Sequence, residues 1–145
     1  MRRFVLILAL GVLGCGTRDD PSAAFIGTWT GALATEGLCI DGSMIARSTF
    51  PVQALITKGT VTDLVCTMQT GMACVTPLDI QDRVVATLVN LGDGCATADG
   101  KPLKLISWSV NQVDDDLVAV NGGGTIDAPA AGGTCTVISG GTLTR

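Results

Sequence analysis

Cysteine thiols are the side chains of this sequence best suited to chemistry. The 145-residue chain has no histidine, which excludes the cysteine–histidine pair that activates a thiol nucleophile. No two cysteines have the C-x-x-C spacing of a redox motif, and disulfides would compete with zinc for the thiols. We therefore predict covalent links rather than a catalytic or metal centre. The cysteines are Cys15, Cys39, Cys66, Cys74, Cys95 and Cys135.

Carboxylates are the other side chains that could ligate a metal ion or catalyse a reaction. The triplet Asp114–Asp116 could ligate calcium with help from Asn111 or Asp127, because hard cations prefer oxygen ligands. The triplet lies between two predicted strands, however, where aspartates are ordinary turn residues. Asp79 and Asp82 resemble a hydrolytic pair, but solvated loop charges are the better interpretation. With no nucleophile elbow, phosphate loop or dinucleotide fingerprint, we predict no enzyme activity, no cofactor and no metal.

The first 15 residues have the organisation of a secretory leader. Arg2 and Arg3 precede an uncharged apolar run at 4–10, which is too short for a spanning helix of about 20 residues. The sequence VLGC at 12–15 resembles the lipobox of bacterial lipoproteins, in which a small residue precedes an invariant cysteine. The resemblance implies that residues 1–14 are a lipoprotein signal peptide and that Cys15 receives fatty acyl chains of the palmitate type.

A lipidated Cys15 would make the protein an anchored one rather than a membrane-spanning one. Two or three acyl chains hold a protein at a membrane essentially permanently, whereas a single chain holds it only marginally. Gly16 resembles the signal for release to the outer membrane of Gram-negative cells. The resemblance therefore implies the bacterial cell envelope, at the outer membrane. We predict a lipidated cysteine and flexible tether at 15–24, followed by a single β domain at 25–145.

The net charge limits the partners of the domain. The chain carries 9 basic and 13 acidic residues, a net charge of −4, and loss of Arg2 and Arg3 with the leader would lower it to −6. An acidic surface disfavours binding to nucleic acid. The partners that remain are the membrane, through the anchor, and a small apolar ligand or an envelope protein.

Alternation of apolar and polar residues dominates from Phe25 onward. Apolar side chains at 50, 52, 54 and 56 share one face of a strand, and Ile106, Trp108 and Val110 share one face of a strand at 104–113. Further predicted strands are 28–34, 60–68, 72–78, 84–91, 117–120 and 135–144, with a weaker one at 43–46. Predicted turns are 58–59, 93–94, 99–100 and 121–124. These predict an all-β, antiparallel meander of about eight strands that closes into a small barrel or sandwich supported by disulfides.

The start of the domain carries a further motif. FIGTWTGAL at 25–33 resembles the G-x-W signature of lipocalins and lipocalin-like domains. The resemblance implies that Gly27 opens the first strand, that Trp29 plugs the closed end of an eight-stranded barrel, and that Arg145 on the last strand lies across its ring. The threonine-aspartate-tyrosine motif of lipocalins is missing, since the chain has no tyrosine.

The five cysteines that follow Cys15 can form disulfides in more than one way. If Cys15 carries lipid, five cysteines remain and one thiol stays unpaired. If residues 69–71 form a three-residue hairpin loop, Cys66 and Cys74 lie opposite each other at a separation that suits a disulfide. Cys39 and Cys135 would then join the first and last parts of a closed sheet.

A second resemblance implies that Cys66 is unpaired, which disagrees with a bond between Cys66 and Cys74. The mature region resembles small uncharacterised bacterial lipoproteins in the order of its features: an early G-x-W, a cysteine soon after, KGTVTDLVC, CVTPLDIQDRVVATL, and a closing GTCTVISGGTLTR. The recurring cysteines of that group match Cys39, Cys74, Cys95 and Cys135, which implies that Cys66 is the extra one. The sequence does not decide whether Cys66 bonds to Cys74 or is the unpaired cysteine.

Two functions from different classes follow from these features. The first is a membrane-anchored binding or structural module of the envelope. The alternative is a lipocalin-like carrier whose barrel holds a small apolar ligand. A continuous apolar cavity of about 300 Å³ or more would favour the carrier, because ligand sites have volumes in that range, whereas a solid core would remove it.

Overall fold

The computed structural model describes residues 20–89, 95–97, 99–129 and 133–145. The leader, Cys15 and the predicted turn at 93–94 lie outside these residues. Nine strands and one short 3-10 helix form most of the described chain. In chain order they are η1 (Pro21–Ala24), β1 (Gly27–Cys39), β2 (Met44–Lys58), β3 (Leu64–Thr70), β4 (Cys74–Asp82), β5 (Val85–Leu88), β6 (Cys95–Ala96), β7 (Pro102–Asp114), β8 (Leu117–Ala128) and β9 (Gly133–Thr144).

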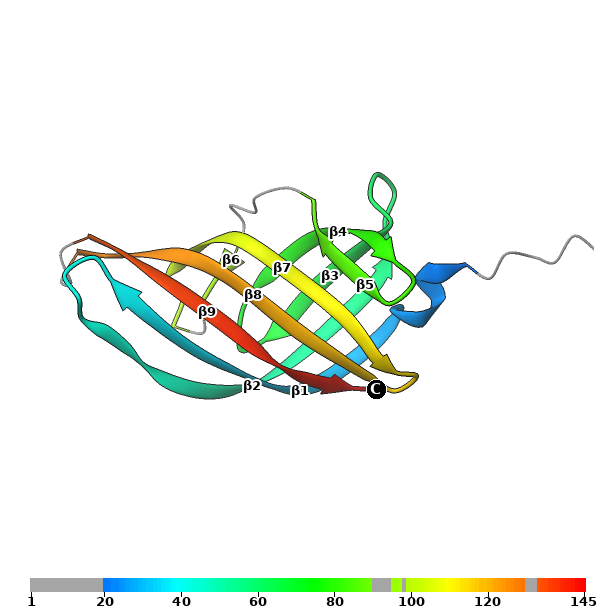
Figure 1. Ribbon diagram of the computed structural model, residues 1–145, viewed down its shortest axis with the longest axis horizontal. Helices are drawn as coiled ribbons and strands as arrows, with labels where there is room; N and C mark the ends of the chain where they lie inside the picture. The colour runs from blue at the N-terminus through cyan, green and yellow to red at the C-terminus, as the bar shows by residue number, and fades with distance from the viewer. Residues whose placement is uncertain (1–19, 90–94, 98, 130–132) are drawn as a thin grey trace, which may run out of the picture.

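All nine strands belong to one antiparallel sheet that closes on itself (Figure 1). Strands β1 to β5 pair in sequence, as do β7 to β9, and β9 returns to pair with β1. Pairing of β5 with β7 completes a ring of eight strands. The predicted all-β meander is confirmed, and its closed form is a barrel supported by two disulfides.

Two short strands close the ring between β4 and β7. At one end of the barrel, Val85–Thr87 of β5 pair with Asn111–Ser109 of β7. At the other end, β6 pairs with the first residues of β7, and Ala96 forms a bridge with Ala73 just before β4. The sequence did not predict β6, because two residues are too few to show a periodic pattern.

Inward-facing apolar residues fill much of the barrel. On β2, Val52, Ala54 and Ile56 are buried and Phe50 packs against them, as the alternation predicted. Trp29 and Leu33 of β1 are fully buried on the same inner face. Every second side chain along these strands therefore points inward and contributes to the core.

The face predicted for Ile106 is wrong. Trp108 and Val110 are buried as predicted, but Ile106 is 53% exposed and Leu105 points inward instead. A register shift between Leu105 and Ser107 breaks the pairing of β7 with β8 at this point. Such a bulge inserts one extra residue, so the alternation before it is reversed relative to the alternation after it.

The turn predicted at 121–124 is also wrong, because these residues lie inside β8. Their glycines allow close packing rather than chain reversal. A Cβ atom at Gly122 would overlap the ring of Trp108, and one at Gly124 would overlap the carbonyl oxygen of Lys104. Glycine within a strand often marks such a close approach, and here it makes room for the indole inside the barrel.

Other strand limits differ modestly from the predictions. β1 runs on to Cys39, and β2 absorbs the weak strand predicted at 43–46. β3 begins at Leu64 rather than at residue 60, because a hydrogen bond from the backbone N–H of Gly59 to the carbonyl oxygen of Asp63 closes a loop there.

The segment before β1 packs on the barrel instead of forming a tether. Asp20 caps η1 by accepting hydrogen bonds from the backbone N–H and the hydroxyl of Ser22, which is buried. Lys58 donates to Asp20 over 2.7 Å, and this bond, followed by those from Ser22, lowers the pKa of Asp20 to about 2. The tether predicted to reach residue 24 therefore ends earlier, because the folded domain already includes Asp20.

Candidate functional site

One end of the barrel is closed by Trp29. Its ring is fully buried, its Nε1–H donates to the carbonyl oxygen of Phe25 over 2.8 Å, and the guanidinium carbon of Arg145 lies 4.9 Å from the ring centroid. Gly27 has a φ of +151°, which other residues rarely adopt. The three residues of the predicted barrel signature therefore meet at this end, where a cation–π contact covers the plug.

Arg145 also holds the turn between β7 and β8. Its guanidinium donates to the carbonyl oxygens of Asp115 and Ile26, and its Nε lies 3.3 Å from Oδ1 of Asp116. The aspartate triplet considered for calcium thus contacts a cation of the chain itself. Among the described residues, no group of three or more cysteine, aspartate and glutamate side chains could hold a metal ion.

Asp79 and Asp82, the residues considered as a hydrolytic pair, each accept a hydrogen bond from a backbone N–H. Asp79 accepts a hydrogen bond from the backbone N–H of Asp63, whose own carboxylate accepts from the backbone N–H of Ile80. Asp82 accepts from the backbone N–H of Arg83. Both residues lie in strand β4 (Cys74–Asp82), not in a loop as the sequence interpretation favoured.

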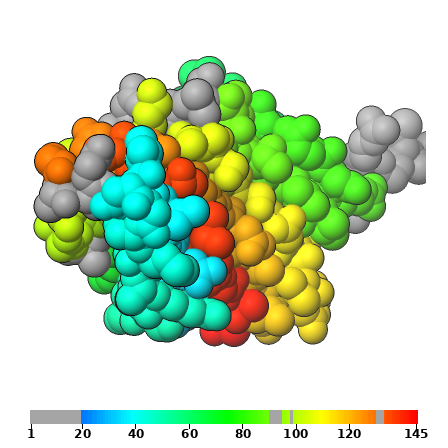
Figure 2. Space-filling model, turned by 60° about the vertical axis from the view of Figure 1, so that its left-hand side comes forward, coloured from blue at the N-terminus to red at the C-terminus, as the bar shows by residue number. Residues whose placement is uncertain are grey.

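The opposite end of the barrel opens into a cavity of about 550 Å³. Loops between β1 and β2, β3 and β4, and β6 and β7 surround it, and Figure 2 shows the β1–β2 hairpin (cyan) at this end of the molecule. The lining is mostly apolar, with several hydroxyl groups. It comprises Thr35, Cys39, Ser43, Met44, Ile45, Ser48, Phe50, Gly71, Met72, Thr97, Asp99, Lys101, Leu103, Ile126, Ala128, Cys135, Val137 and Ser139.

Both disulfides stand at the open end. Cys39 and Cys135 are directly paired across β1 and β9 and are bonded to each other. Cys74 at the start of β4 is bonded to Cys95 of β6, which joins the two sides of the ring where β5 does not reach. Sulfur bonds therefore hold the walls of the cavity together at two places.

The predicted disulfide between Cys66 and Cys74 is wrong. The last cross-strand pair of the β3–β4 hairpin is Met68 with Cys74, which leaves five residues between the paired positions instead of three, and Cys66 lies opposite Thr76. Gly71 has the positive φ that the prediction required, at +77°. The four bonded cysteines are those that the resemblance to bacterial lipoproteins matched, and the bond between Cys39 and Cys135 joins the first and last strands as expected. Cys66 is the free cysteine among the described residues.

The thiol of Cys66 is buried and unsuited to nucleophilic chemistry. Its side chain is 1% exposed. Burial raises its pKa to about 11, and a hydrogen bond with Thr76 opposes this rise only in part. A thiol with such a pKa stays protonated at neutral pH, so Cys66 acts as a small core residue.

We expect Cys66 to make the protein less stable as the pH rises from about 9 to about 11. The folded-state pKa is about 11, above the ordinary value of 9.0, so the unfolded chain loses its thiol proton first. The free energy of unfolding then falls by roughly 2–3 kcal/mol across this window. Urea unfolding at a series of pH values measures the fall, and Cys66→Ala removes it. Equal pH dependence in the two proteins would contradict this origin.

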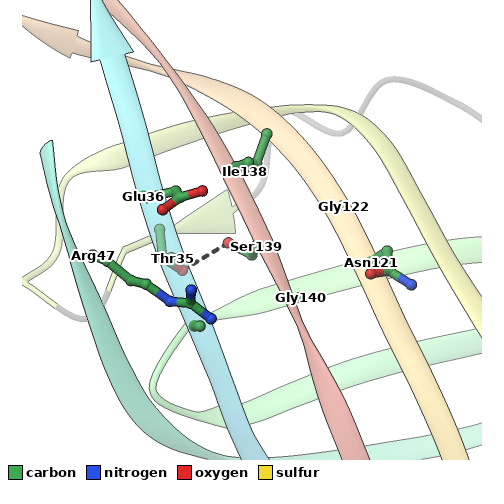
Figure 3. Close-up of a pocket in the computed structure, with 9 residues that line it drawn as sticks. Thr35, Glu36, Arg47, Asn121, Gly122, Ile138, Ser139 and Gly140 are labelled. Atoms are coloured by element: carbon green, nitrogen blue, oxygen red, sulfur yellow. Dashed lines mark hydrogen bonds between the residues drawn. The ribbon is translucent and has the colours of Figure 1, made fainter. Parts of the chain in front are cut away.

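A second, smaller depression of about 390 Å³ adjoins β1, β8 and β9. Figure 3 shows the hydrogen bond between Thr35 and Ser139, which crosses from β1 to β9, with Arg47 and Asn121 on either side of this strand pair. The same lining includes the oppositely charged residues Glu36 and Arg47. This mixed and shallow lining selects no class of ligand, so the open-end cavity is the better candidate site.

Sequence analysis missed the polar residues of the cavity, although a signal for one of them was present. Alternation along β1 from Trp29 through Leu33 places Thr35 on the inner face. Ser48 and Ser139 are its cross-strand neighbours, and only the register identifies them.

The chain matches no protein-family model, no curated protein and no solved structure at a significant level. Within the part of the chain that the structure describes, no helix is both long and apolar enough to cross a membrane. The site must therefore be interpreted from its own geometry.

Proposed function

We propose that this protein is a lipid-anchored lipoprotein of the bacterial envelope whose barrel carries a small apolar ligand. The observation that supports carriage is the open-end cavity of about 550 Å³. Ligand sites generally have volumes of about 300–1,000 Å³ and a mostly apolar lining with a few polar groups. The cavity meets both criteria, which favours a carrier over a structural module with a solid core.

The rest of the barrel is suited to keep such a cavity in shape. Trp29, Leu33 and Trp108 fill the barrel below it, and two disulfides join its walls. A preformed site loses little conformational entropy when a ligand binds. The protein would therefore bind its ligand without a large rearrangement of the barrel.

The described chain begins at Asp20, next to η1, at the closed end of the barrel. In Figure 1, η1 and the C-terminus lie at one end of the barrel, and the turn between β1 and β2 lies at the other. An anchor that precedes Asp20 would attach the closed end to the membrane, leaving the cavity mouth facing away from it. Two or more acyl chains at the cysteine would make this attachment lasting.

We expect the protein extracted from bacterial membranes to begin at residue 15 and to carry acyl chains there. Intact-mass spectrometry measures both properties, and Cys15→Ser supplies the control, because it removes the only sulfur at which the lipobox can be modified. A native protein that keeps Met1, or one released from membranes by salt without detergent, would contradict the anchor.

We expect the cavity to bind N-phenyl-1-naphthylamine, a neutral dye whose fluorescence rises in apolar sites. Ile45 lines the cavity from β2, so Ile45→Trp fills part of it and should weaken binding at least ten-fold. Ile138 is 54% exposed and does not line this cavity, so Ile138→Trp makes the same change outside the barrel. Its affinity should stay within two-fold of the native value.

A thermal melt of each variant separates cavity filling from unfolding, and the smaller change Ile45→Phe gives a second test if Ile45→Trp is unstable. Absence of binding by the native protein would contradict the carrier, as would an equal loss in Ile45→Trp and Ile138→Trp.

A further inference from the structure

Three hydroxyl side chains lie next to one another on one wall of the cavity. Thr35 of β1 is directly paired with Ser48 of β2 on one side and with Ser139 of β9 on the other. Cross-strand partners point to the same face of a sheet, and all three residues line the cavity. We call Ser48, Thr35 and Ser139 the hydroxyl strip.

The hydroxyl strip has hydrogen-bonding capacity left over. Oγ1 of Thr35 and Oγ of Ser139 are 2.8 Å apart, and either one can be the donor. Two hydroxyls have two O–H donors, so this bond uses one of them and leaves the other. Ser48 adds a third hydroxyl, which makes no hydrogen bond with another described residue. The strip can therefore both donate to a ligand oxygen and accept from a ligand O–H.

Apolar residues flank the hydroxyl strip on the side of the cavity, whereas Thr35 and Ser139 also border the shallow depression lined by Arg47. Phe50 follows Ser48 on the inner face of β2, and Val137 precedes Ser139 on the inner face of β9. Ile45, Leu103 and Ile126 provide further apolar lining. A ligand whose apolar body fills the cavity excludes water from its own oxygen, so a hydrogen bond from the hydroxyl strip to that oxygen favours binding.

The cavity offers no free charge to an ionic ligand among its described lining residues. Its charged residues are Asp99 and Lys101 in the loop before β7, and they form an ion pair over 2.9 Å. Hydrogen bonds from Thr97 and Lys101 lower the pKa of Asp99, so the pair persists at neutral pH. A ligand carboxylate would have to displace Asp99 from Lys101 in a protein that is already acidic.

We propose that the ligand is a neutral apolar molecule with one uncharged oxygen function, an alcohol, an ester or a ketone, which the hydroxyl strip binds. This inference depends on the proposed carrier function and adds the chemical class of the ligand. The apolar body fills the cavity beside Phe50 and Val137, and its oxygen contacts Thr35 and Ser139. Charged amphiphiles of the same chain length bind less well, because they lose hydration without gaining a counter-ion.

The test compares three probes of one chain length: 1-octanol, octane and octanoate. Their affinities follow from displacement of N-phenyl-1-naphthylamine from the full chain carrying Cys15→Ser, which cannot be acylated and needs no detergent. Thr35→Val keeps the shape of the side chain and removes its hydroxyl. We expect it to weaken binding of 1-octanol about three- to ten-fold and to leave octane within two-fold, and Ser139→Ala should act likewise. Octanoate should bind more weakly than 1-octanol to the native protein.

Thr49→Val is the matched control. Thr49 lies beside Ser48 on β2 but is exposed, and it pairs with Ala34 on the outer face of the sheet. The same substitution there should change none of the three affinities. A melt of Thr35→Val checks that the barrel stays folded, and Ser139→Ala repeats the test on the other strand.

The outcomes separate this inference from the carrier function. If 1-octanol binds and both hydroxyl variants leave its affinity unchanged, or weaken octane equally, the hydroxyl strip does not bind the oxygen and the inference fails alone. Tighter binding of octanoate than of 1-octanol, lost in Lys101→Met, would overturn it in favour of ionic recognition at the mouth. If none of the three probes displaces the dye and the dye itself does not bind, the carrier function fails as well.

Discussion

We expect Trp29→Ala to lower the free energy of unfolding by about 3–5 kcal/mol. The ring is fully buried and closes one end of the barrel, so its removal leaves a large void. It also leaves the carbonyl oxygen of Phe25 without its donor and the guanidinium of Arg145 without its aromatic partner. Domains of this size are commonly stable by about 5–15 kcal/mol, so the loss is a large share of the total.

Urea unfolding measures this loss, because Trp108 remains as a fluorescent reporter of the core. Trp29→Phe keeps an aromatic ring and removes the Nε1–H donor, and it should cost clearly less than alanine. Ile106→Ala is the control on the outer face, where truncation should change stability by no more than about 0.5 kcal/mol. A loss below about 1 kcal/mol in Trp29→Ala would show that the plug contributes little to folding.

We expect removal of the Cys39–Cys135 disulfide to cost more than removal of the Cys74–Cys95 disulfide. The first spans 96 residues of sequence and the second 21. Closing a loop restricts the unfolded chain more as the loop lengthens, which gives about 4.7 kcal/mol for the longer loop and about 3.4 kcal/mol for the shorter. Both contributions matter to this chain because it has few large aromatic side chains with which to build a core.

The paired alanine variants Cys39→Ala with Cys135→Ala, and Cys74→Ala with Cys95→Ala, test this order by urea unfolding without reductant. Cys66→Ala serves as the control, since it removes a thiol from the core without breaking a bond. A larger loss for the shorter loop would contradict an effect that acts through the unfolded chain. Such a result would instead assign the stabilisation to the cavity wall that Cys95 joins to β4.

The inner faces of the strands could be predicted from the sequence because alternation is a local property. Val52, Ala54 and Ile56 point inward wherever β2 pairs, since successive side chains of a strand point to opposite faces. Ile106 is the exception that shows the limit of the argument. A bulge in β7 reverses the alternation there, and the sequence between Leu105 and Ser107 carries no sign of it.

Cysteine pairing could not be derived from local spacing. A hairpin loop of three residues would have joined Cys66 to Cys74, and a longer loop moves Cys74 by two positions along its partner strand. Cys74 therefore still points inward but meets Cys95 of β6 instead. The resemblance to bacterial lipoproteins implied that Cys66 is the unpaired cysteine, but it did not say which of the other four bond to each other.

The sequence by itself determined the class of the fold and the inner faces of most strands, and its resemblance to lipocalins implied the closed end, where Gly27, Trp29 and Arg145 meet. Only the tertiary structure decided which cysteines pair, that the other end opens into a cavity, and that hydroxyls on β2, β1 and β9 stand side by side within it. The physical reason is that side-chain direction repeats every two residues along a strand, while register and closure depend on pairings between segments about 100 residues apart.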